Sequence, residues 1–368
     1  KLENKGTLRN YGLNGANNDR QNLRGIKGTL ILTTGNHLNP STIINNGLFT
    51  LKATKLSNTG TIDNNDSMIL IKQIDNTGTI NNNATGTIIV KDNFYNNTSG
   101  TISNNGIINH DATAAGNEFV NNNRLTNDTS GTININTSSN FKNTNTIVNN
   151  NIINISGTLT NDVSTGNITN NKTITNDGNI VNKDTIINTA TGIINNNNNF
   201  YNYDSIVNNG IINVNYTIEG GVIFNYKTFN NNNGASINNY DSIVNMETNA
   251  NNLHSVSTSS LRGILSNTGT ITNYLGTLEN KGNFTNNTAG KLIIEGGEVK
   301  NKGTFSNQNT GDIRVKMNGT LRNDTIGIFN HTASVKITND GAIVNKHHFK
   351  DAYKITNNGT FTNDYILS

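Results

Sequence analysis

One short phrase recurs along the whole chain: an apolar residue, Asn two positions later, Gly after two more, and a second apolar residue two positions beyond. It begins, for example, at Leu56, Leu265 and Ile355. Such a repeat predicts a stacked architecture in which each unit buries its apolar residues against its neighbours. We therefore expect one continuous solenoid over residues 1–368 with surface-loop insertions and no domain boundary.

The composition agrees with a thin core. Only 32% of the residues are hydrophobic, against about 45–50% apolar residues in an ordinary globular domain, and Asn alone makes up about 22% of the chain. There is no cysteine, which excludes disulfides, thiol catalysis and cysteine-ligated zinc. Stability must come from backbone pairing and side-chain packing.

The spacing of the apolar positions predicts short strands. They recur about six to eight residues apart, among too many Gly and Asn residues for helices. Leu278, Phe284, Leu292 and Val299 are followed about 21 residues later by Val299, Phe305, Ile313 and Leu321. The fold class expected is all-β, a single-stranded parallel β-solenoid (β-helix) with about 20 residues and three short strands per coil, hence roughly 18 coils over this length.

Two residue sets define the expected coil. The predicted inward-facing core residues are Leu56, Ile62, Ile74, Ile80, Ile174, Ile180, Leu265, Ile271, Leu278, Phe284, Leu292, Val299, Phe305, Ile313, Leu321, Ile355 and Phe361. The predicted turn residues are Gly60, Gly78, Gly178, Gly269, Gly282, Gly303 and Gly359. We expect the glycines to supply positive φ at the corners, with Asp184, Asp204 and Asp241 as turn carboxylates elsewhere. Corner Asn residues are expected to form amide ladders along the axis.

Irregular stretches interrupt the phrase and predict surface loops, which are the expected carriers of specific contacts. They are Tyr11–Lys27, Asn36–Ser41, Asp111–Asn123, Val214–Ala235, Asn245–Gly263 and Lys346–Tyr353.

No residue cluster points to catalysis or to a cofactor. The closest acidic pairs are Asp63 with Asp66 and Glu295 with Glu298, and solvated turn charges explain them better than an acid–base pair. The chain is therefore expected not to be an enzyme. A polysaccharide lyase or hydrolase on a β-helix is the remaining catalytic alternative, because neighbouring coils can assemble a site that the sequence does not show.

Metal binding has equally little support. His347, His348 and Asp351 lie together, with His331 upstream, but a metal site needs three or four converging ligands. A surface loop is the better interpretation, and neither a metal nor a cofactor is expected.

Five tyrosines between residues 200 and 240 allow two readings: Tyr201, Tyr203, Tyr216, Tyr226 and Tyr240. They are able to form a strip on which sugar rings stack, or to pack on one another along one corner. We expect the packing role.

Charge and hydropathy exclude two partner classes. The formal net charge of +3 comes without a run of Lys and Arg, so nucleic acid is not expected as a partner. No apolar run approaches the roughly 18 residues of a transmembrane helix, so no transmembrane segment is expected.

The phrase Asn-x-Gly-Thr-Ile-x-Asn resembles the repeats of filamentous-haemagglutinin-like adhesins and fibre proteins, a group of Asn- and Thr-rich surface proteins. The resemblance covers nearly all of the chain. It implies a right-handed solenoid, secretion to the cell surface, and a role in adhesion, stalks, sheaths or fibres. The secretion domain that precedes the repeats in such adhesins is not visible in this sequence.

Two functions follow as expectations. The phrase is already present at Leu2 and still present at Ile355, without the polar caps of a soluble solenoid, and uncapped coils pair with other chains. We expect a non-catalytic subunit or segment of an extracellular filament or sheath that assembles by open-ended coil stacking. The alternative is an adhesin shaft that binds a glycan or a cell-surface protein through its loops.

Overall fold

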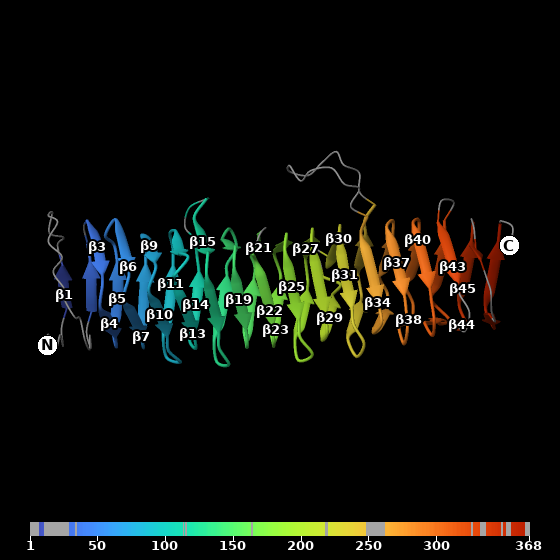
Figure 1. Ribbon diagram of the computed structural model, residues 1–368, viewed down its shortest axis with the longest axis horizontal. Helices are drawn as coiled ribbons and strands as arrows, with labels where there is room; N and C mark the ends of the chain where they lie inside the picture. Colours follow the sequence, from blue (N-terminus) through green and yellow to red (C-terminus); the bar gives the residue numbers. More distant parts are fainter. Residues whose placement is uncertain are drawn as a thin grey trace. The chain divides into compact units, whose positions relative to one another are not determined.

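The computed structural model describes residues 7–10, 29–33, 35–112, 114, 116–162, 165–217, 220–247, 262–324, 327–331, 336–346, 349–350 and 355–364. It divides into two compact units, Lys1–Ile180 and Val181–Ser368. Each unit is a stack of coils (Figure 1). Each coil contributes one strand to each of three parallel sheets, named A, C and B in the order in which the chain meets them.

In the first unit, sheet A contains β1 (Thr7–Asn10), β2 (Thr29–Leu32), β5 (Leu48–Leu51), β8 (Ser67–Leu70), β11 (Thr87–Val90), β14 (Ile107–His110), β17 (Thr132–Ile135), β20 (Ile152–Ile155) and β23 (Thr173–Asn176). Sheet C contains β3 (Asn36–Asn39), β6 (Lys55–Asn58), β9 (Gln73–Asn76), β12 (Phe94–Asn96), β15 (Glu118–Asn121), β18 (Asn140–Asn143) and β21 (Thr158–Asn161). Sheet B contains β4 (Thr42–Asn45), β7 (Thr61–Asn64), β10 (Thr79–Asn82), β13 (Thr101–Asn104), β16 (Arg124–Asn127), β19 (Thr146–Asn149) and β22 (Asn167–Asn170).

In the second unit the same letters mark the corresponding sides of a coil, and β24 (Asn179–Asn182) lies at the division between the units. Sheet A contains β26 (Ile193–Asn196), β29 (Ile211–Val214), β32 (Ser236–Asn239), β35 (Thr270–Asn273), β38 (Lys291–Ile294), β41 (Asp312–Val315), β44 (Lys336–Asn339) and β47 (Ile355–Asn357). Sheet C contains β27 (Asn199–Asn202), β30 (Val222–Asn225), β33 (Ser242–Asn245), β36 (Thr277–Asn280), β39 (Glu298–Asn301), β42 (Thr320–Asn323), β45 (Ala342–Asn345) and β48 (Thr360–Asn363). Sheet B contains β25 (Thr185–Asn188), β28 (Ser205–Asn208), β31 (Thr228–Asn231), β34 (Ile264–Asn267), β37 (Asn283–Asn286), β40 (Thr304–Asn307), β43 (Ile328–His331) and β46 (Phe349–Lys350).

A typical strand has four residues, of which the second and fourth point inward. In β10, Ile80 and Asn82 are fully buried, whereas Thr79 and Asn81 lie on the outer face and are half-buried. Successive side chains of a strand point to opposite faces, so four residues suffice for one side of a coil. Thr and Ile are β-branched and fit this half-buried surface.

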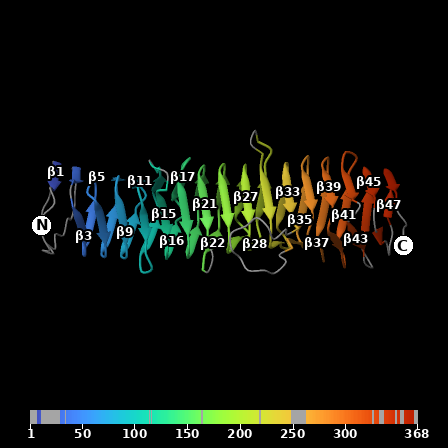
Figure 2. The ribbon, with the colours of Figure 1, turned by 90° about the horizontal axis from the view of Figure 1, so that it is seen from above.

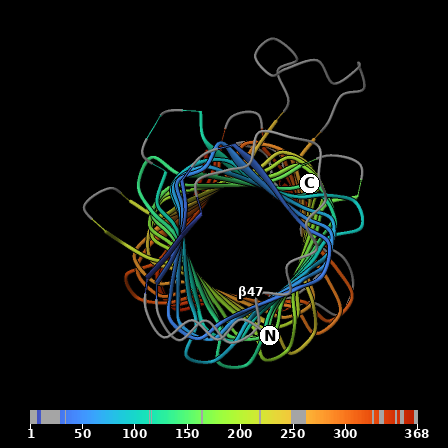
Figure 3. The ribbon, with the colours of Figure 1, turned by 90° about the vertical axis from the view of Figure 1, so that its left-hand side faces the viewer.

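The coils pair residue by residue. Ile80 of β10 lies opposite Ile62 of the coil before it and opposite Ile102 of the coil after it. The view from above shows neighbouring strands side by side within each unit (Figure 2). Seen along the stacking direction, the strands form the straight sides of each coil and the turns form its corners (Figure 3). Three parallel strands and about 21 residues per coil confirm the predicted fold class.

The predicted core residues lie inside the coils. Fifteen of the seventeen, from Leu56 to Leu321, are at most 1% exposed. Ile355 and Phe361 are half-buried, since no described coil packs on the far side of β47 and β48. Phenylalanines stack on one another inside, with ring centroids 4.3 Å apart for Phe94 and Phe119 and 4.5 Å apart for Phe284 and Phe305.

The glycines occupy the predicted turns, but for a different reason than positive φ. Among the described residues, the glycines with positive φ are Gly35, Gly116, Gly220 and Gly234, and none of these is one of the seven predicted turn glycines. Those seven lie against the backbone of the preceding coil: a Cβ atom built on any of them would lie 1.9–2.3 Å from a carbonyl oxygen there. They are required by close approach of two coils.

Four predicted loops contain regular strands. Asn36–Ser41 includes β3, Asp111–Asn123 includes β15, Val214–Ala235 includes β30 and β31, and Lys346–Tyr353 includes β46. In Asn36–Ser41 the repeat phrase is hard to recognise because Leu38 lies on the outer face of β3, where it is 50% exposed. In Val214–Ala235 the reason is that β30 places Val and Phe on its outer face beside the inward-facing Ile223. Tyr11–Lys27 lies outside the described residues. The handedness of the solenoid and its continuity over residues 1–368 stay predictions.

Candidate functional site

Every described strand of sheets B and C except β43 and β46 ends in an asparagine, which lies at the inner corner of its coil. In the first unit these residues are Asn45, Asn64, Asn82, Asn104, Asn127, Asn149 and Asn170 in sheet B, and Asn39, Asn58, Asn76, Asn96, Asn121, Asn143 and Asn161 in sheet C. All but Asn39, which is 4% exposed, have no exposed surface. A fully buried primary amide is costly unless its hydrogen bonds are made.

These amides hydrogen-bond to one another in two chains, which we call the amide ladders. Each Nδ2 atom donates to the Oδ1 atom of the asparagine one coil later, over 2.7 Å from Asn45 to Asn64 and 2.8 Å from Asn104 to Asn127. The same Nδ2 atoms also donate to backbone carbonyls, as Asn82 does to Gly86 and Ile107 over 3.1 and 3.0 Å. The ladders therefore join each coil to the next at two of its three corners.

The second unit repeats this arrangement. Its sheet C ladder runs from Asn182 through Asn202, Asn225, Asn245, Asn280, Asn301, Asn323 and Asn345 to Asn363. Its sheet B ladder runs from Asn188 through Asn208, Asn231, Asn267 and Asn286 to Asn307. Long insertions leave the ladder intact, since Asn245 bonds to Asn280 over 2.8 Å across 35 positions of sequence.

Every rung of these inner ladders points the same way along the chain. The edge of a coil that faces the following coil therefore presents Nδ2–H donors, and the opposite edge presents Oδ1 acceptors. Asn239 shows the cost of an unmatched edge: it follows Val214 in sheet A, and its buried Oδ1 atom has no hydrogen-bond partner, although its Nδ2 donates to Asn273 over 2.6 Å. One donor edge and one acceptor edge fit each other only head to tail.

Sheet A of the first unit is different, because from β2 to β20 apolar residues and one histidine stand at the ladder position: Leu32, Leu51, Leu70, Val90, His110, Ile135 and Ile155. His110 is fully buried between Val90 and Ile135, and neither ring nitrogen has a hydrogen-bond partner. Its ring meets Phe119 edge-on, with centroids 6.0 Å apart. Burial lowers the pKa of His110 to about 4, against the opposing effect of the nearby Asp111 carboxylate, so the ring is neutral at pH 7.

An ion-pair cluster covers the outer face of sheet C in the second unit. Glu279 accepts from Lys302 and Lys281, with N to O distances of 2.7 and 3.1 Å. One coil further on, Arg322 lies 3.5 Å from Asp324 and 3.7 Å from Glu298. Burial tends to raise the pKa of Glu279, but the two lysines outweigh it and lower the pKa overall. The cluster pairs charges between adjacent coils and leaves no group aimed at a hollow.

The tyrosines pack face to face along the stacking direction. Ring centroids are 4.8 Å apart for Tyr203 and Tyr226 and 4.5 Å apart for Tyr240 and Tyr274, with nearly parallel planes. Burial and the neighbouring tyrosines raise the pKa of Tyr203 to about 12. Because the ring faces contact each other, this geometry favours the packing role over a sugar-stacking strip. Tyr216, which is 80% exposed, stands outside the stacks.

The two members of each acidic pair have different surroundings. Asp63, on the outer face of β7, accepts from Asn81 over 2.7 Å, whereas Asp66 binds the backbone N–H of Ser67 in the next turn. Glu298 faces outward on β39, and Glu295 lies at the preceding corner, beside a hollow. Asp204 pairs with Lys227 over 2.6 Å at a turn, as a turn carboxylate does.

The histidine candidates cannot be placed together. His347, His348 and Asp351 lie outside the described residues, and His331 is the last residue of β43. Among the residues that the structure describes, no three His, Asp or Glu side chains gather as a metal site would require.

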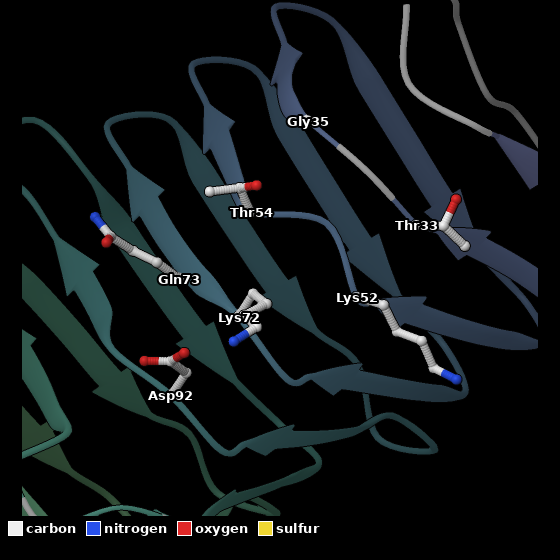
Figure 4. A pocket seen from close by; sticks show the side chains of 7 residues that line it. All are labelled: Thr33, Gly35, Lys52, Thr54, Lys72, Gln73 and Asp92. Carbon is white, nitrogen blue, oxygen red and sulfur yellow. The ribbon is translucent and has the colours of Figure 1, made fainter.

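Two open hollows lie at the corners between sheets A and C. The hollow in the first unit has a volume of about 440 Å³ and is lined by Thr33, Gly35, Lys52, Thr54, Lys72, Gln73 and Asp92. Figure 4 shows that Lys52 and Lys72 extend in different directions. The hollow in the second unit, about 500 Å³, is lined by Glu295, Lys316, Met317, Asn318, Asp340 and Asn358. Neither has the apolar walls of a typical small-molecule pocket.

Within the described residues, no helix is long and apolar enough to cross a membrane. Comparisons with known proteins place this chain in no family: no protein-family model matches it, and no curated protein matches it. Among solved structures, a hyper-glycosylated fragment of TibA, residues 55–350, modified by TibC, is 13% identical and aligns over 86% of this chain and 97% of its own, with a TM-score of 0.32. So low a TM-score does not indicate a shared fold, and the function proposed below rests on the coils themselves.

Proposed function

We propose that this protein is a non-catalytic structural element, a subunit or segment of an extracellular filament or sheath whose coils stack head to tail. The observation that carries the proposal is the uniform direction of the buried amide ladders. A donor edge meets an acceptor edge when a second molecule continues the stack, and backbone pairing of the parallel strands continues with it.

A contact of this kind joins two different edges and does not close on itself, so it propagates. The cell-surface location follows from the resemblance of the repeat phrase to surface fibre proteins. The outer faces support a structural role, because their charged side chains pair with neighbours in adjacent coils, as Lys142 does with Asp162 over 2.7 Å.

Sedimentation velocity over a wide range of concentrations tests the assembly, with negative-stain electron microscopy of the same samples. The proposal expects species that lengthen with concentration at constant width. A single sedimenting species of one chain at every concentration would contradict it. Antibody labelling of intact cells that produce the protein tests the location: labelling only after lysis would contradict a surface role.

The second candidate is a shaft that binds a glycan or a cell-surface protein. It is supported by large apolar side chains that project from corners of the second unit, Leu275 and Met317, which are 77% and 82% exposed. Both lie at the corner between sheets A and C, two coils apart, and exposed apolar side chains that gather in one place mark interaction sites. Replacement of both by Ser leaves self-assembly unchanged, and loss of binding to glycan arrays or to cells in that variant would favour this candidate.

A further inference from the structure

The outer face of sheet A in the first unit differs from the other outer faces in its chemistry. Over eight consecutive strands, from β2 to β23, none of the outward positions carries a charge. They are Thr29, Ile31, Leu48, Thr50, Ser67, Ile69, Thr87, Ile89, Ile107, Asn109, Thr132, Asn134, Ile152, Asn154, Thr173 and Thr175.

The other two outer faces of the same unit carry charges. Sheet C presents Lys55, Asp75 and Lys142, and sheet B presents Asp63 and Arg124. Charged residues are depleted in the centres of protein interfaces. The absence of charge on sheet A is the pattern of a covered surface.

Five large apolar residues of this face lie on neighbouring strands. Ile31, Ile69 and Ile89 are half-buried in the outward column of β2, β8 and β11. Beside them Leu48 and Ile107 are 36% and 41% exposed. All five lie on five neighbouring strands of a parallel sheet, β2, β5, β8, β11 and β14, where side chains of a second sheet can interdigitate with them.

We propose that this face, the sheet A face, packs against the same face of a second copy of this chain, so that two solenoids lie side by side. An uncharged surface of Thr, Ile and Asn is compatible with itself, because no like charges meet and no ion is desolvated. The contact is isologous, with the same residues contributed by both copies. It deepens the proposed function, since it adds a lateral contact to the coil stacking.

The area of the face is sufficient for such a contact. Eight strands at about 4.8 Å spacing and four residues at about 3.3 Å each give a face of roughly 38 by 13 Å, or about 500 Å² per copy. Two copies then bury about 1,000 Å², the lower limit of a specific interface. Pairs along a filament repeat the contact and increase its avidity.

Introduction of charged side chains on the sheet A face tests the inference in the full chain. The variant I69K/I89K places two lysines on the sheet A face, and the matched control I44K/V148K places two on the outer face of sheet B, where Ile44 and Val148 are also half-buried. Outward lysine is compatible with this fold, as Lys291 shows on sheet A of the second unit. Thermal unfolding checks that both variants fold equally well.

Electron microscopy and sedimentation velocity then measure width and mass. The inference expects wild type and control to form pairs two solenoids wide, and I69K/I89K to form single-width particles with pairing at least 10-fold weaker. The pairing is also expected to persist at 1 M salt, where exposed ion pairs are screened. Single-width wild-type particles, or equal weakening in both variants, would overturn it.

Site-specific crosslinking gives a second readout that does not depend on charge. Since the chain has no cysteine, Ile89→Cys and the control Val148→Cys each provide one thiol for a short bis-maleimide. The inference expects dimers from Ile89→Cys only. Single-width filaments without lateral dimers would contradict lateral pairing and support coil stacking. Lateral pairs that never lengthen would support lateral pairing and contradict coil stacking.

Discussion

The Nδ2 atom of Asn82 donates to the Oδ1 atom of Asn104 over 2.7 Å, although 22 positions separate the two residues in the chain. Both side chains are fully buried. The pair joins two successive coils at an inner corner, and Asn104 in turn donates to Asn127 over 2.8 Å. Because each rung satisfies a buried amide, the ladder contributes to stability mainly through the cost of breaking it.

Asn104→Ala should therefore destabilise the protein substantially. It removes the Oδ1 atom that accepts from Asn82 and the Nδ2 atom that donates to Asn127. The two buried amides that each lose a hydrogen bond cost about 3 kcal/mol in total. Chemical denaturation measures the loss. The matched control is Asn65→Ala, which removes an asparagine that bonds to Asn46 and Asn83 at an outer corner. Water replaces those bonds, so the control should lose less than about 1 kcal/mol. Equal losses would contradict the ladder's role.

Gly78→Ala should destabilise the protein more than Gly234→Ala. A Cβ atom at Gly78 would lie 2.0 Å from the carbonyl oxygen of Gly60, so the coils must separate, and overpacking costs about 1–3 kcal/mol. Gly234 has φ of +85° and nothing within 4 Å of a Cβ, so alanine there meets only backbone strain of about 1 kcal/mol. Urea denaturation of both variants decides between close approach and positive φ as the reason for the predicted turn glycines.

His110 should make the first unit sensitive to acid. Its pKa is about 4 in the folded chain, against the ordinary histidine value of 6.5, so the unfolded chain binds the proton first. Stability is complete above pH 6.5, falls as the pH drops toward 4, and levels off below that. The difference corresponds to about 3 kcal/mol.

The variant His110→Leu isolates this effect, because Leu already occupies the equivalent inward position at Leu51 and Leu70. The free energy of unfolding, taken from denaturation curves measured between pH 7 and pH 4, should fall less steeply with pH for the variant than for wild type. Identical slopes for the two proteins would show that His110 is not neutral and buried in the folded state.

Glu279→Gln should have a small, salt-dependent effect. The lysines beside Glu279 hold its pKa below the usual range. Its contribution to the free energy of unfolding is therefore present above the pKa that Glu279 has in the unfolded chain, and it is lost as the pH falls through the lower pKa of the folded chain. Partly exposed pairs contribute less than about 1 kcal/mol. Unfolding at pH 7 in low and high salt measures it; a loss that 1 M salt does not reduce would contradict a surface ion-pair role.

The sequence predicted the coil but not the reason for some of its residues. Thr79, Ile80 and Gly78 follow the repeat phrase, and the phrase alone predicts one strand with its turn. The amide ladder of corner asparagines was predicted from the sequence and is confirmed. The repeat phrase did not show that these side chains point inward, because only the neighbouring coil supplies their hydrogen-bond partners. The signal was present in the register, since Asn82 and Asn104 occupy the same position of the phrase.

Other features depend on contacts that the phrase does not encode. His110 stands where the neighbouring coils carry Val90 and Ile135, and its ring nitrogens lack partners because both of these residues are apolar. The pairing of Glu279 with Lys302 joins sites 23 positions apart, and it emerges only when the register is known. The charge-free sheet A face also needed the strand order to bring its residues together.

The most direct test of coil stacking between molecules is a cryo-electron microscopy map of the purified full chain assembled at high concentration. The account predicts filaments in which strands continue across the junction between molecules at a spacing of about 4.8 Å, with asparagine side chains in register at the sheet C corner, where the ladder reaches Asn363. Particles that never join through their coil edges, or filaments held together only by other surfaces, would contradict it.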